Sequence, residues 1–224
     1  MINMKNNSTL FQHKFWQNDA INRNIDHPVV SFFVNQRMEF ISKFISLKQI
    51  ESVLDVGAGR GYSSSHFLKN SDVVATDFSS TQLKKNPMKK KIICDSERMP
   101  FQDQSFSLVN EWELLHHLDD PHKTVKEMAR IAKDYLILFE PNRQNPGQFI
   151  FSIKKKEERN VLKHHKKMMY ELVKNIGFNV IECKTVGCVF PNRMPTAILS
   201  IAKKMPFELP IIGLSNIIIC KRRR

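Results

Sequence analysis

The sequence has few cysteines and no long apolar run. The first absence argues against a zinc site, and the second argues against a membrane-spanning helix. Its 224 residues include four cysteines, and Cys183 and Cys188 lack a second pair of Cys or His at the spacing of a zinc site. We therefore predict reduced thiols and no metal site. The longest uncharged stretch near the C-terminus, residues 209–220, is shorter than a membrane-spanning helix requires.

Targeting signals and repeats are also missing from the sequence. The polar beginning "MINMKNNSTLFQHK" lacks the apolar centre of a signal peptide, so we expect a cytoplasmic protein. No internal repeat or low-complexity tract is present, and 42% of the residues are hydrophobic. A chain of this size and composition is expected to fold as a single domain around one substantial core.

Positive charge is concentrated in the last third of the chain. Residues 1–150 carry 19 Lys+Arg against 17 Asp+Glu, whereas residues 151–224 carry 16 against 5, out of a net charge of +13. The first part is therefore almost neutral. We expect the C-terminal part to face either an anionic partner or water, and the lysine runs "KKNPMKKK" and "KHHKK" to form a solvated face.

The stretch "VLDVGAGRGYSS" predicts a ligand-binding turn behind a buried strand. An apolar run ends at Asp55, and Gly57, Gly59 and Gly61 permit a tight turn with close approach of backbone to ligand. A helix is expected over residues 60–69, with its free N–H groups facing the ligand. A dinucleotide site usually has its third glycine one position later, where this chain has Tyr62.

Apolar runs alternate with amphipathic stretches along the chain, which predicts an α/β fold. After the glycine turn, the expected strands are residues 72–77, 91–94, 106–110, 135–140 and 178–183, with a last strand in 211–220. Helices are expected over 27–44, from 121 after an N-cap at Asp120, and over 157–174. Strand–helix units in this order form a doubly wound sheet, with ligands beyond the carboxyl ends of the strands.

Carboxylates at successive strand ends indicate the kind of ligand. Asp77 closes the second strand, where a ribose would present two hydroxyl donors, and Asp95 and Ser96 follow the third strand, where an adenine amine would lie. Asp55, Asp77 and Asp95 around one turn suit a ligand with a cationic centre, an amine and several hydroxyls. S-adenosylmethionine is such a ligand, whereas a dinucleotide presents a pyrophosphate.

Four motifs in order resemble those of class I S-adenosylmethionine-dependent methyltransferases of the small-molecule and lipid-modifying kind. They lie within residues 50–140 and include "VLDVGAGRGYSS", "VVATDFSS" and "CDSERMPFQDQSFSLVNEWELLHHLDDP". The resemblance implies a seven-stranded Rossmann-like sheet whose last strand is antiparallel, with an N-terminal helix and a C-terminal insertion as a cap. It departs from the family pattern at Ser107, where an Asp is usual.

The resemblance also implies domain limits and cofactor contacts. We expect one methyltransferase domain over residues 1–224, with a helical cap (1–48), a cofactor-binding core (49–185), a cap insertion (186–213) and a last strand with a basic tail (214–224). The implied cofactor contacts are Asp55, Gly57, Gly59, Gly61, Asp77, Phe78, Asp95, Ser96, Asn110 and Trp112.

Candidate catalytic residues follow the fourth strand. Methyl transfer from a sulfonium mainly requires in-line placement of the nucleophile, but a base helps to activate a hydroxyl or an acidic carbon. His116, His117 and Glu113 are the candidates, with Glu140 a further titratable group near a strand end. The alternative is that the two histidines only hydrogen-bond nearby backbone.

Three functions remain open at this point. The first is a methyltransferase acting on a small-molecule or lipid-like acceptor. The second is an RNA or protein methyltransferase, which is less favoured because "NEWE" replaces the D/N-P-P-aromatic motif of enzymes that methylate nucleobase amines, and because the basic stretches contain few stacking aromatics. The third is a non-catalytic module that binds S-adenosylmethionine and uses its basic face for partners.

The segment "VFPNRMPTAILSIAKKMPFELPIIG" suggests the nature of the acceptor and of a further partner. It combines apolar residues with Lys203 and Lys204, which suits an apolar acceptor with an anionic head, such as a lipid-linked or quinone-type intermediate. Together with residues 221–224, these lysines also predict a peripheral contact with an anionic membrane. The alternative is a soluble, capped pocket with a solvated basic rim.

Overall fold

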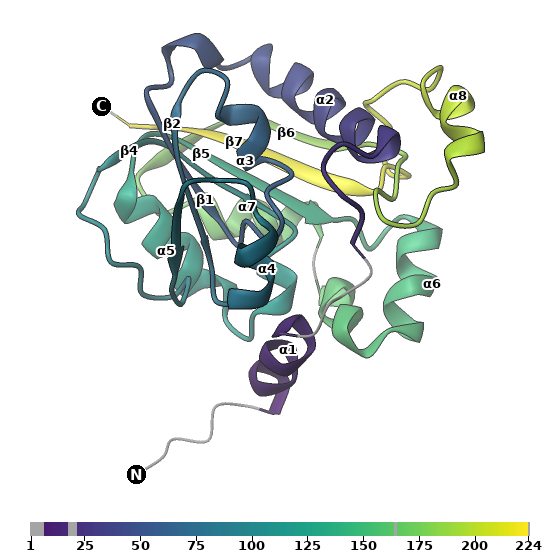
Figure 1. Cartoon of the computed structure of the whole chain (residues 1–224), viewed down its shortest axis with the longest axis horizontal. Coiled ribbons are helices and arrows are strands. Elements are labelled where there is room, and N and C mark those ends of the chain that lie inside the picture. Colours follow the sequence, from purple (N-terminus) through teal and green to yellow (C-terminus); the bar gives the residue numbers. More distant parts are fainter. Residues whose placement is uncertain (1–6, 18–21, 164, 224) are drawn as a thin grey trace.

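A computed structural model describes residues 7–17, 22–163 and 165–223. Its strands form one seven-stranded sheet at the centre of the molecule (Figure 1). The strands are β1 (Ser52–Val56), β2 (Asp72–Asp77), β3 (Lys90–Ile93), β4 (Phe106–Trp112), β5 (Ala132–Pro141), β6 (Phe178–Val186) and β7 (Ser215–Arg222).

The sheet has the doubly wound order β3-β2-β1-β4-β5-β7-β6. Strands β1 to β5 pair in parallel, whereas β7 lies antiparallel between β5 and β6. The chain order reverses at β1, where β2 lies on one side and β4 on the other, and such a switch point is where α/β sheets bind ligands. The predicted fold class, with its last strand antiparallel, is confirmed.

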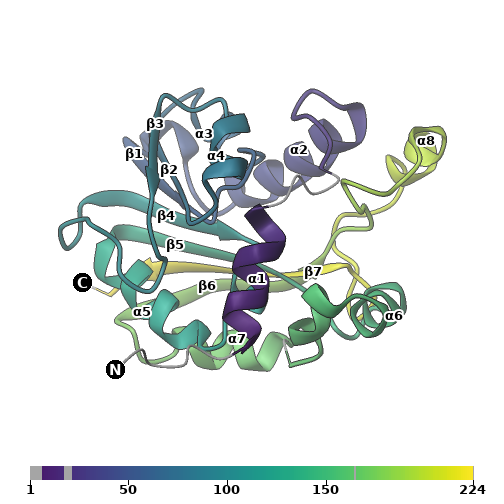
Figure 2. The same cartoon turned by 60° about the horizontal axis from the view of Figure 1, so that its bottom comes forward.

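Helices cover both faces of the sheet (Figure 2). One face carries α2 (Pro28–Ser42), α3 (Ser64–Phe67) and α4 (Ser80–Lys85), and the other carries α5 (Pro121–Ile131) and α7 (Lys166–Val173). Alternate residues of β1 therefore enter different cores: Val53 packs with the α2 side and Leu54 with the α5 side. Both are fully buried, which is why the strand reads as a continuous apolar run.

Two predicted helices differ from those in the structure. Residues 60–63 form turns and only Ser64–Phe67 are helical, because Gly57, Gly59 and Gly61 all take positive φ angles that prolong the turn. The single helix expected over 157–174 is also wrong. A 3-10 helix, η3 (Lys156–Lys163), is followed by α7, whose N-cap His165 accepts from the Met168 N–H; residue 164 lies outside the described residues.

The predicted cap segments contain helices that the sequence pattern did not suggest. The first 48 residues form α1 (Asn7–Gln17) as well as α2, with residues 1–6 and 18–21 outside the described part. Beyond β5 lies α6 (Pro146–Lys154), and the insertion of residues 186–213 contains η4 (Thr196–Ile198) and α8 (Leu199–Ala202). The remaining short elements are η1 (Leu47–Gln49) and η2 (Leu115–His117).

The C-terminal basic residues lie far from the apolar insertion, contrary to the prediction that they flank it. Ser215 begins β7 beside the insertion, and Arg222 lies at the other end of this strand, about 23 Å away for an eight-residue strand. There the Arg222 guanidinium donates to the carbonyls of Ala129, Ala132 and Lys133. The antiparallel direction of β7 separates the two groups, and Arg224 lies outside the described residues.

Candidate active site

A cavity of about 600 Å³ opens at the carboxyl ends of β1, β2 and β4, beneath the cap segments. Ten of the thirteen residues predicted for the site line it: Gly57, Gly59, Asp77, Phe78, Asp95, Ser96, Trp112, Glu113, His116 and His117. The three that do not are Asp55, Gly61 and Asn110. Its size is ordinary for a site that holds a cofactor or a small ligand.

The three glycines of the turn have different surroundings. All have positive φ, at +66° for Gly57, +49° for Gly59 and +88° for Gly61, in the region that side chains other than glycine rarely adopt. A Cβ on Gly57 would lie 2.9 Å from Leu114, and one on Gly61 would lie 2.9 Å from the Asn86 side chain. A Cβ on Gly59 would meet nothing within 4 Å, so this backbone borders open cavity.

Asp77 is held at the cavity wall by two backbone donors. Its Oδ2 accepts from the Gly59 N–H at 2.9 Å and its Oδ1 from the Ser79 N–H at 2.8 Å. Burial raises the pKa of Asp77, and these hydrogen bonds oppose that shift. A carboxylate has about four lone-pair sites, and the Phe78 backbone also hydrogen-bonds to Asp77, so the carboxylate keeps capacity to accept from a ligand.

Asp95, Ser96 and Phe78 complete this side of the cavity. The Asp95 Oδ1 accepts from the Glu97 N–H at 2.9 Å, which fixes the turn after β3. The Ser96 hydroxyl lies 3.0 Å from that of Thr124. Strand ends β2 and β3 therefore bring the predicted residues together on one wall, which we call the glycine wall: Gly57, Gly59, Asp77, Phe78, Asp95 and Ser96.

Asp55 and Asn110 are buried behind the glycine wall. The Asp55 carboxylate accepts from the Ser63 and Ser64 hydroxyls and, at 3.0 Å, from the Asn110 amide. Burial raises the pKa of Asp55 in spite of these donors. Its side chain ties the end of β1 to the start of α3, so the geometry gives it a role in holding the turn, while direct cofactor contact by Asp55 and Asn110 stays a prediction.

On the opposite side of the cavity, His116 is held between two carboxylates. Its Nδ1 lies 2.9 Å from Glu140 Oε2, and its Nε2 lies 3.4 Å from Glu158 Oε2. Burial disfavours the imidazolium, but Glu140 and Glu158 outweigh it and raise the pKa of His116 to about 10. Glu140 also accepts from the Leu115 and His116 N–H groups at 2.7 and 3.0 Å, so it fixes the backbone as well as the ring.

His117 lies against His116 but has the opposite electrostatic character. The two ring centroids are 3.8 Å apart, and Trp16 of α1 packs edge-on at 5.0 Å. Burial and the charge of His116 lower the pKa of His117 to about 3, so this imidazole is neutral at physiological pH. Its Nδ1 is buried and has no hydrogen-bond partner within the described residues.

Glu113 borders the cavity near a buried arginine. Its φ of +61° turns the chain sharply after β4, and its carboxylate lies 3.9 Å from the Arg37 guanidinium. Burial raises the pKa of Glu113, and the positive charges of Arg37 and His116 only partly oppose this shift. Arg37 is itself 2% exposed, donates to the Ser215 hydroxyl at 2.9 Å and lies 3.4 Å above the Phe33 ring. No motif or spacing in the sequence singles out this arginine.

Two buried carboxyl groups, Glu111 and Glu140, lie behind this side of the cavity. Glu111 and Glu140 are both 0% exposed, and Glu111 accepts from the Phe139 and Leu114 N–H groups at 3.0 and 3.1 Å. Burial and the neighbouring Glu140 raise the pKa of Glu111 well above its ordinary value. We call the group His116, His117, Glu113, Glu140 and Glu158 the histidine wall.

Hydrogen bonds between distant segments close the cap over the glycine turn. Tyr62, at the position of the third dinucleotide glycine, donates its hydroxyl to the Arg23 carbonyl at 2.8 Å and lies 2.7 Å from Asn192 Oδ1. Arg23 in turn donates to the carbonyls of Pro191 and Met194 at 3.0 and 2.8 Å. These contacts join the N-terminal segment to the insertion of residues 186–213.

The fold and part of the sequence are similar to those of known methyltransferases. Residues 54–138 match the family described as "Methyltransferase domain". The chain has the fold of class I S-adenosylmethionine-dependent methyltransferases, and the resemblance seen in the sequence is confirmed. Among the described residues, no helix is both long and apolar enough to cross a membrane.

Individual relatives are similar over different lengths. A demethylmenaquinone methyltransferase of Renibacterium salmoninarum is 38% identical over 88 residues, which cover 37% of this chain and 37% of that protein. A methyltransferase of Thermotoga maritima superposes with a TM-score of 0.67 at 18% identity, covering 87% of this chain and 91% of that one. The magnesium protoporphyrin IX methyltransferase of Synechocystis PCC 6803 has a TM-score of 0.63 at 11% identity, covering 99% and 100%.

Proposed function

We propose that this protein transfers a methyl group from S-adenosylmethionine to a small, largely apolar acceptor. The observation that carries the proposal is that the turn after β1 and the ends of β2 and β3 place Gly59, Asp77 and Asp95 on one wall of a single cavity. This is the donor and acceptor set that a methionine moiety, a ribose and an adenine require. The methyltransferases similar to it in sequence and fold support the same assignment.

Different residues bind different parts of the cofactor. Gly59 lets the backbone approach the methionine part, and Asp77 accepts from the two ribose hydroxyls with the lone pairs that its backbone donors leave free. The bound sulfonium is already a strong electrophile, so the main requirement is in-line placement of the acceptor atom. Such approximation supplies roughly 7–11 kcal/mol of a barrier.

The cavity also suits an acceptor with an apolar ring. Besides the polar groups of its two walls, its lining includes the apolar side chains Trp112, Phe151, Phe190 and Leu214. An aromatic or quinone-type acceptor carrying one ionisable oxygen or acidic carbon matches this division. The name of one relative, a demethylmenaquinone methyltransferase, indicates an acceptor of that type for that relative. Catalytic roles for His116, His117 and Glu113 stay predictions.

Calorimetry with S-adenosylhomocysteine and with NAD tests the cofactor. We expect the first to bind and the second not to, because Tyr62 is fixed under the cap by Arg23 and a dinucleotide requires glycine there. Saturation at about 100 times the dissociation constant would raise the free energy of unfolding by about 2.7 kcal/mol. Binding of NAD with no binding of S-adenosylhomocysteine would overturn the proposal.

The cap also offers a surface for the membrane that holds such an acceptor. Phe149, Ile150 and Ile153 of α6 are 46–53% exposed, and Ile211 and Ile212 are 65% and 55% exposed. The two groups adjoin each other, because Asn142 donates to the Ile211 carbonyl at 2.7 Å and Asn145 donates to that of Ile212. Exposed Lys154 and Lys155 follow on α6.

We expect stronger binding to vesicles with anionic lipid than to neutral vesicles, weakening with salt. The double variant Lys154→Gln, Lys155→Gln, beside this apolar surface, should weaken it by about 1 kcal/mol for each lysine. Lys89→Gln, in the exposed turn before β3, is the matched control and should change little. Equal binding to both kinds of vesicle would leave the cap as a soluble rim and remove this part of the proposal.

A further inference from the structure

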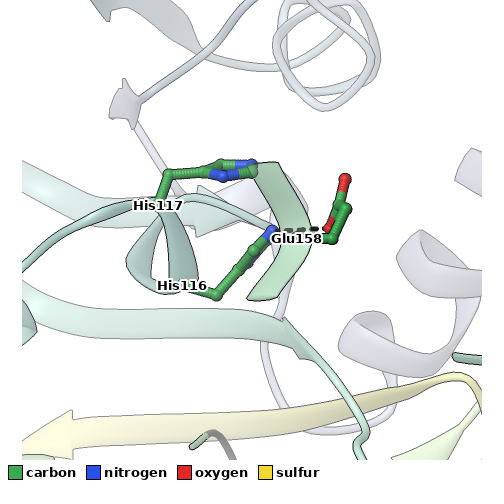
Figure 3. Close-up of side chains that lie close together, drawn as sticks. All are labelled: His116, His117 and Glu158. Atoms are coloured by element: carbon green, nitrogen blue, oxygen red, sulfur yellow. Dashed lines mark ion pairs between the residues drawn. The ribbon is translucent and has the colours of Figure 1, made fainter. Parts of the chain in front are cut away.

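Two histidines and a glutamate at the edge of the cavity form a ready set of metal ligands. His116 and His117 come from η2 and Glu158 from η3, and Figure 3 shows their side chains turned toward one another. One ligand atom from each residue lies within 4.8 Å of those of the other two. Within the set, His116 Nε2 and Glu158 Oε2 are 3.4 Å apart, the separation of two ligands on one ion with bonds of about 2.0–2.2 Å.

The groups behind this set hold the ligands in place. Glu140 lies 2.9 Å from His116 Nδ1 and is itself anchored by two backbone N–H groups, so the ring presents Nε2 to Glu158. A carboxylate behind a histidine is the usual outer partner of a metal-binding imidazole. The His117 ring is held by Trp16 and His116, and it is hydrogen-bonded to the backbone of Glu157.

A second observation points to a missing ligand at the same place. The buried Nδ1 of His117 has no hydrogen-bond partner in the part of the chain that the structure describes, and buried polar atoms are rarely left without one. The His116 ring, for comparison, contacts carboxylates through both nitrogens. A cation between the three side chains would give His117 a partner and would offset the charges of Glu140 and Glu158.

We propose that His116, His117 and Glu158 bind one divalent transition-metal ion of the zinc type. Two imidazoles and one carboxylate are borderline ligands that suit Zn²⁺, Co²⁺ or Fe²⁺ rather than Mg²⁺ or Ca²⁺. All three residues line the cavity, so the fourth position of the ion faces the space where an acceptor would lie. A closed structural site would leave no such position.

The role of the ion rests on the proposed methyl transfer. At the open position it would bind an oxygen of the acceptor and favour loss of the hydroxyl proton to water. The oxygen would then form a bond to the methyl carbon as the bond from that carbon to sulfur breaks. The sulfonium would leave as the neutral thioether S-adenosylhomocysteine, so atoms and charge balance without another reactant.

The test measures metal binding apart from activity. Full-length protein without a histidine tag is stripped with a chelator and titrated with Zn²⁺, Co²⁺ and Mg²⁺ in the calorimeter, and the Co²⁺ form is examined by visible absorption. We expect one Zn²⁺ or Co²⁺ per chain, a tetrahedral-type Co²⁺ spectrum and no binding of Mg²⁺. Failure of both Zn²⁺ and Co²⁺ to bind with this stoichiometry would overturn the proposal.

Variants identify the ligands. Loss of an outer partner of a metal ligand lowers metal affinity by roughly 10–100-fold, and Glu140→Gln should lower Zn²⁺ affinity by about this factor. Glu158→Gln and His117→Gln each remove a ligand and should lower Zn²⁺ affinity by more. Glu157→Gln, the same change one residue earlier, should keep the wild-type affinity, and thermal melting verifies that each variant is folded. Equal Zn²⁺ affinity in folded Glu158→Gln and wild type would overturn the assignment.

Binding of S-adenosylhomocysteine is measured separately on the same stripped protein. If Zn²⁺ binds and S-adenosylhomocysteine does not, the metal site stands and the proposed function fails. If S-adenosylhomocysteine binds and Zn²⁺ does not, only the metal proposal fails. The sequence predicted no metal site because its cysteines lack the spacing of zinc ligands, whereas Glu158 reaches the histidines only through the fold.

Discussion

The two walls of the cavity are built from different interactions. On the glycine wall and directly behind it, backbone N–H groups and hydroxyls satisfy the carboxylates: Asp77 accepts from Gly59 and Ser79, and Asp55, behind the wall, accepts from two serines. On the histidine wall, buried ionisable side chains hold one another, with Glu140 against His116 at 2.9 Å. The glycine wall therefore depends on local chain geometry, and the histidine wall depends on charge balance between segments that are distant in sequence.

Removing Glu140 should produce the largest effect, because it breaks the charge balance of the histidine wall. Glu140→Ala removes one of the two carboxylates that contact the buried His116 and the acceptor of two backbone N–H groups, so the free energy of unfolding should fall by roughly 3–5 kcal/mol. Urea unfolding in the presence of a chelator measures this change without metal.

The double variant Glu140→Gln, His116→Gln provides the matched control for Glu140→Ala. Since neither residue is then charged, it should recover part of the lost stability. A loss below about 1 kcal/mol in Glu140→Ala, the usual range for exposed ion pairs, would contradict the view that this wall depends on buried charge.

Asp77→Ala tests the glycine wall in the opposite way, through ligand binding. S-adenosylhomocysteine affinity should fall by about 1.5–3 kcal/mol, the range for hydrogen bonds to a charged group, which is roughly a 10- to 150-fold rise in dissociation constant. Calorimetry measures it, with Asp72→Ala at the exposed beginning of the same strand as control. An unchanged dissociation constant in a folded variant would show that the cofactor lies elsewhere.

Gly61→Ala and Gly59→Ala separate folding from binding within the glycine turn, and of these two glycines only Gly59 belongs to the glycine wall. Gly61→Ala places a Cβ 2.9 Å from Asn86, whose amide is tied to the Gly59 carbonyl and the Met88 N–H, so it should reduce stability by roughly 1–2 kcal/mol or more. The Cβ of Gly59→Ala meets nothing within 4 Å, so this variant should reduce the free energy of unfolding by less than Gly61→Ala does. It should weaken the binding of S-adenosylhomocysteine. Equal effects of both variants in both assays would remove the distinction.

The pH dependence of stability should report the raised pKa of Glu111, which lies behind the histidine wall. Because the pKa of Glu111 is raised above 4.5 in the folded chain, unfolding releases its proton, and stability falls as pH rises from 4.5 to the folded pKa. The slope is at most about 1.4 kcal/mol for each pH unit. Urea titrations of wild type and Glu111→Gln between pH 5 and pH 8 compare the two slopes, and parallel curves would argue against a protonated Glu111.

The difference between the two walls, local chain geometry against contacts between distant segments, explains which parts of the site could be predicted from sequence. Gly57, Gly59, Asp77 and Asp95 each follow a strand directly, and the carboxyl ends of neighbouring parallel strands lie at one edge of the sheet. Their proximity therefore follows from strand order alone. The fold class was predictable for the same reason, since buried parallel strands read as apolar runs separated by helical patterns.

The histidine wall required tertiary information. His116 and His117 are predictable because they follow β4, but the sequence places Glu158 in the first turn of a helix expected over 157–174, and only the break at His165 and the packing of η3 on η2 bring it to the histidines. Arg37 read as part of an amphipathic helix, and the contact of Tyr62 with Arg23 and Asn192 joins three distant segments. No spacing rule connects such residues.

The position of β7 constrains how the nascent chain can fold. This strand follows all others in the sequence, yet it lies between β5 and β6 and forms the only ladder that joins β6 to the described sheet. While residues 215–222 are still unsynthesised, the edge of β5 with its buried Leu136, Ile137 and Leu138 has no neighbour on that side. Such contacts between distant residues raise contact order and slow folding, and exposed apolar edges aggregate, so we expect the emerging chain to be the species most in need of a chaperone.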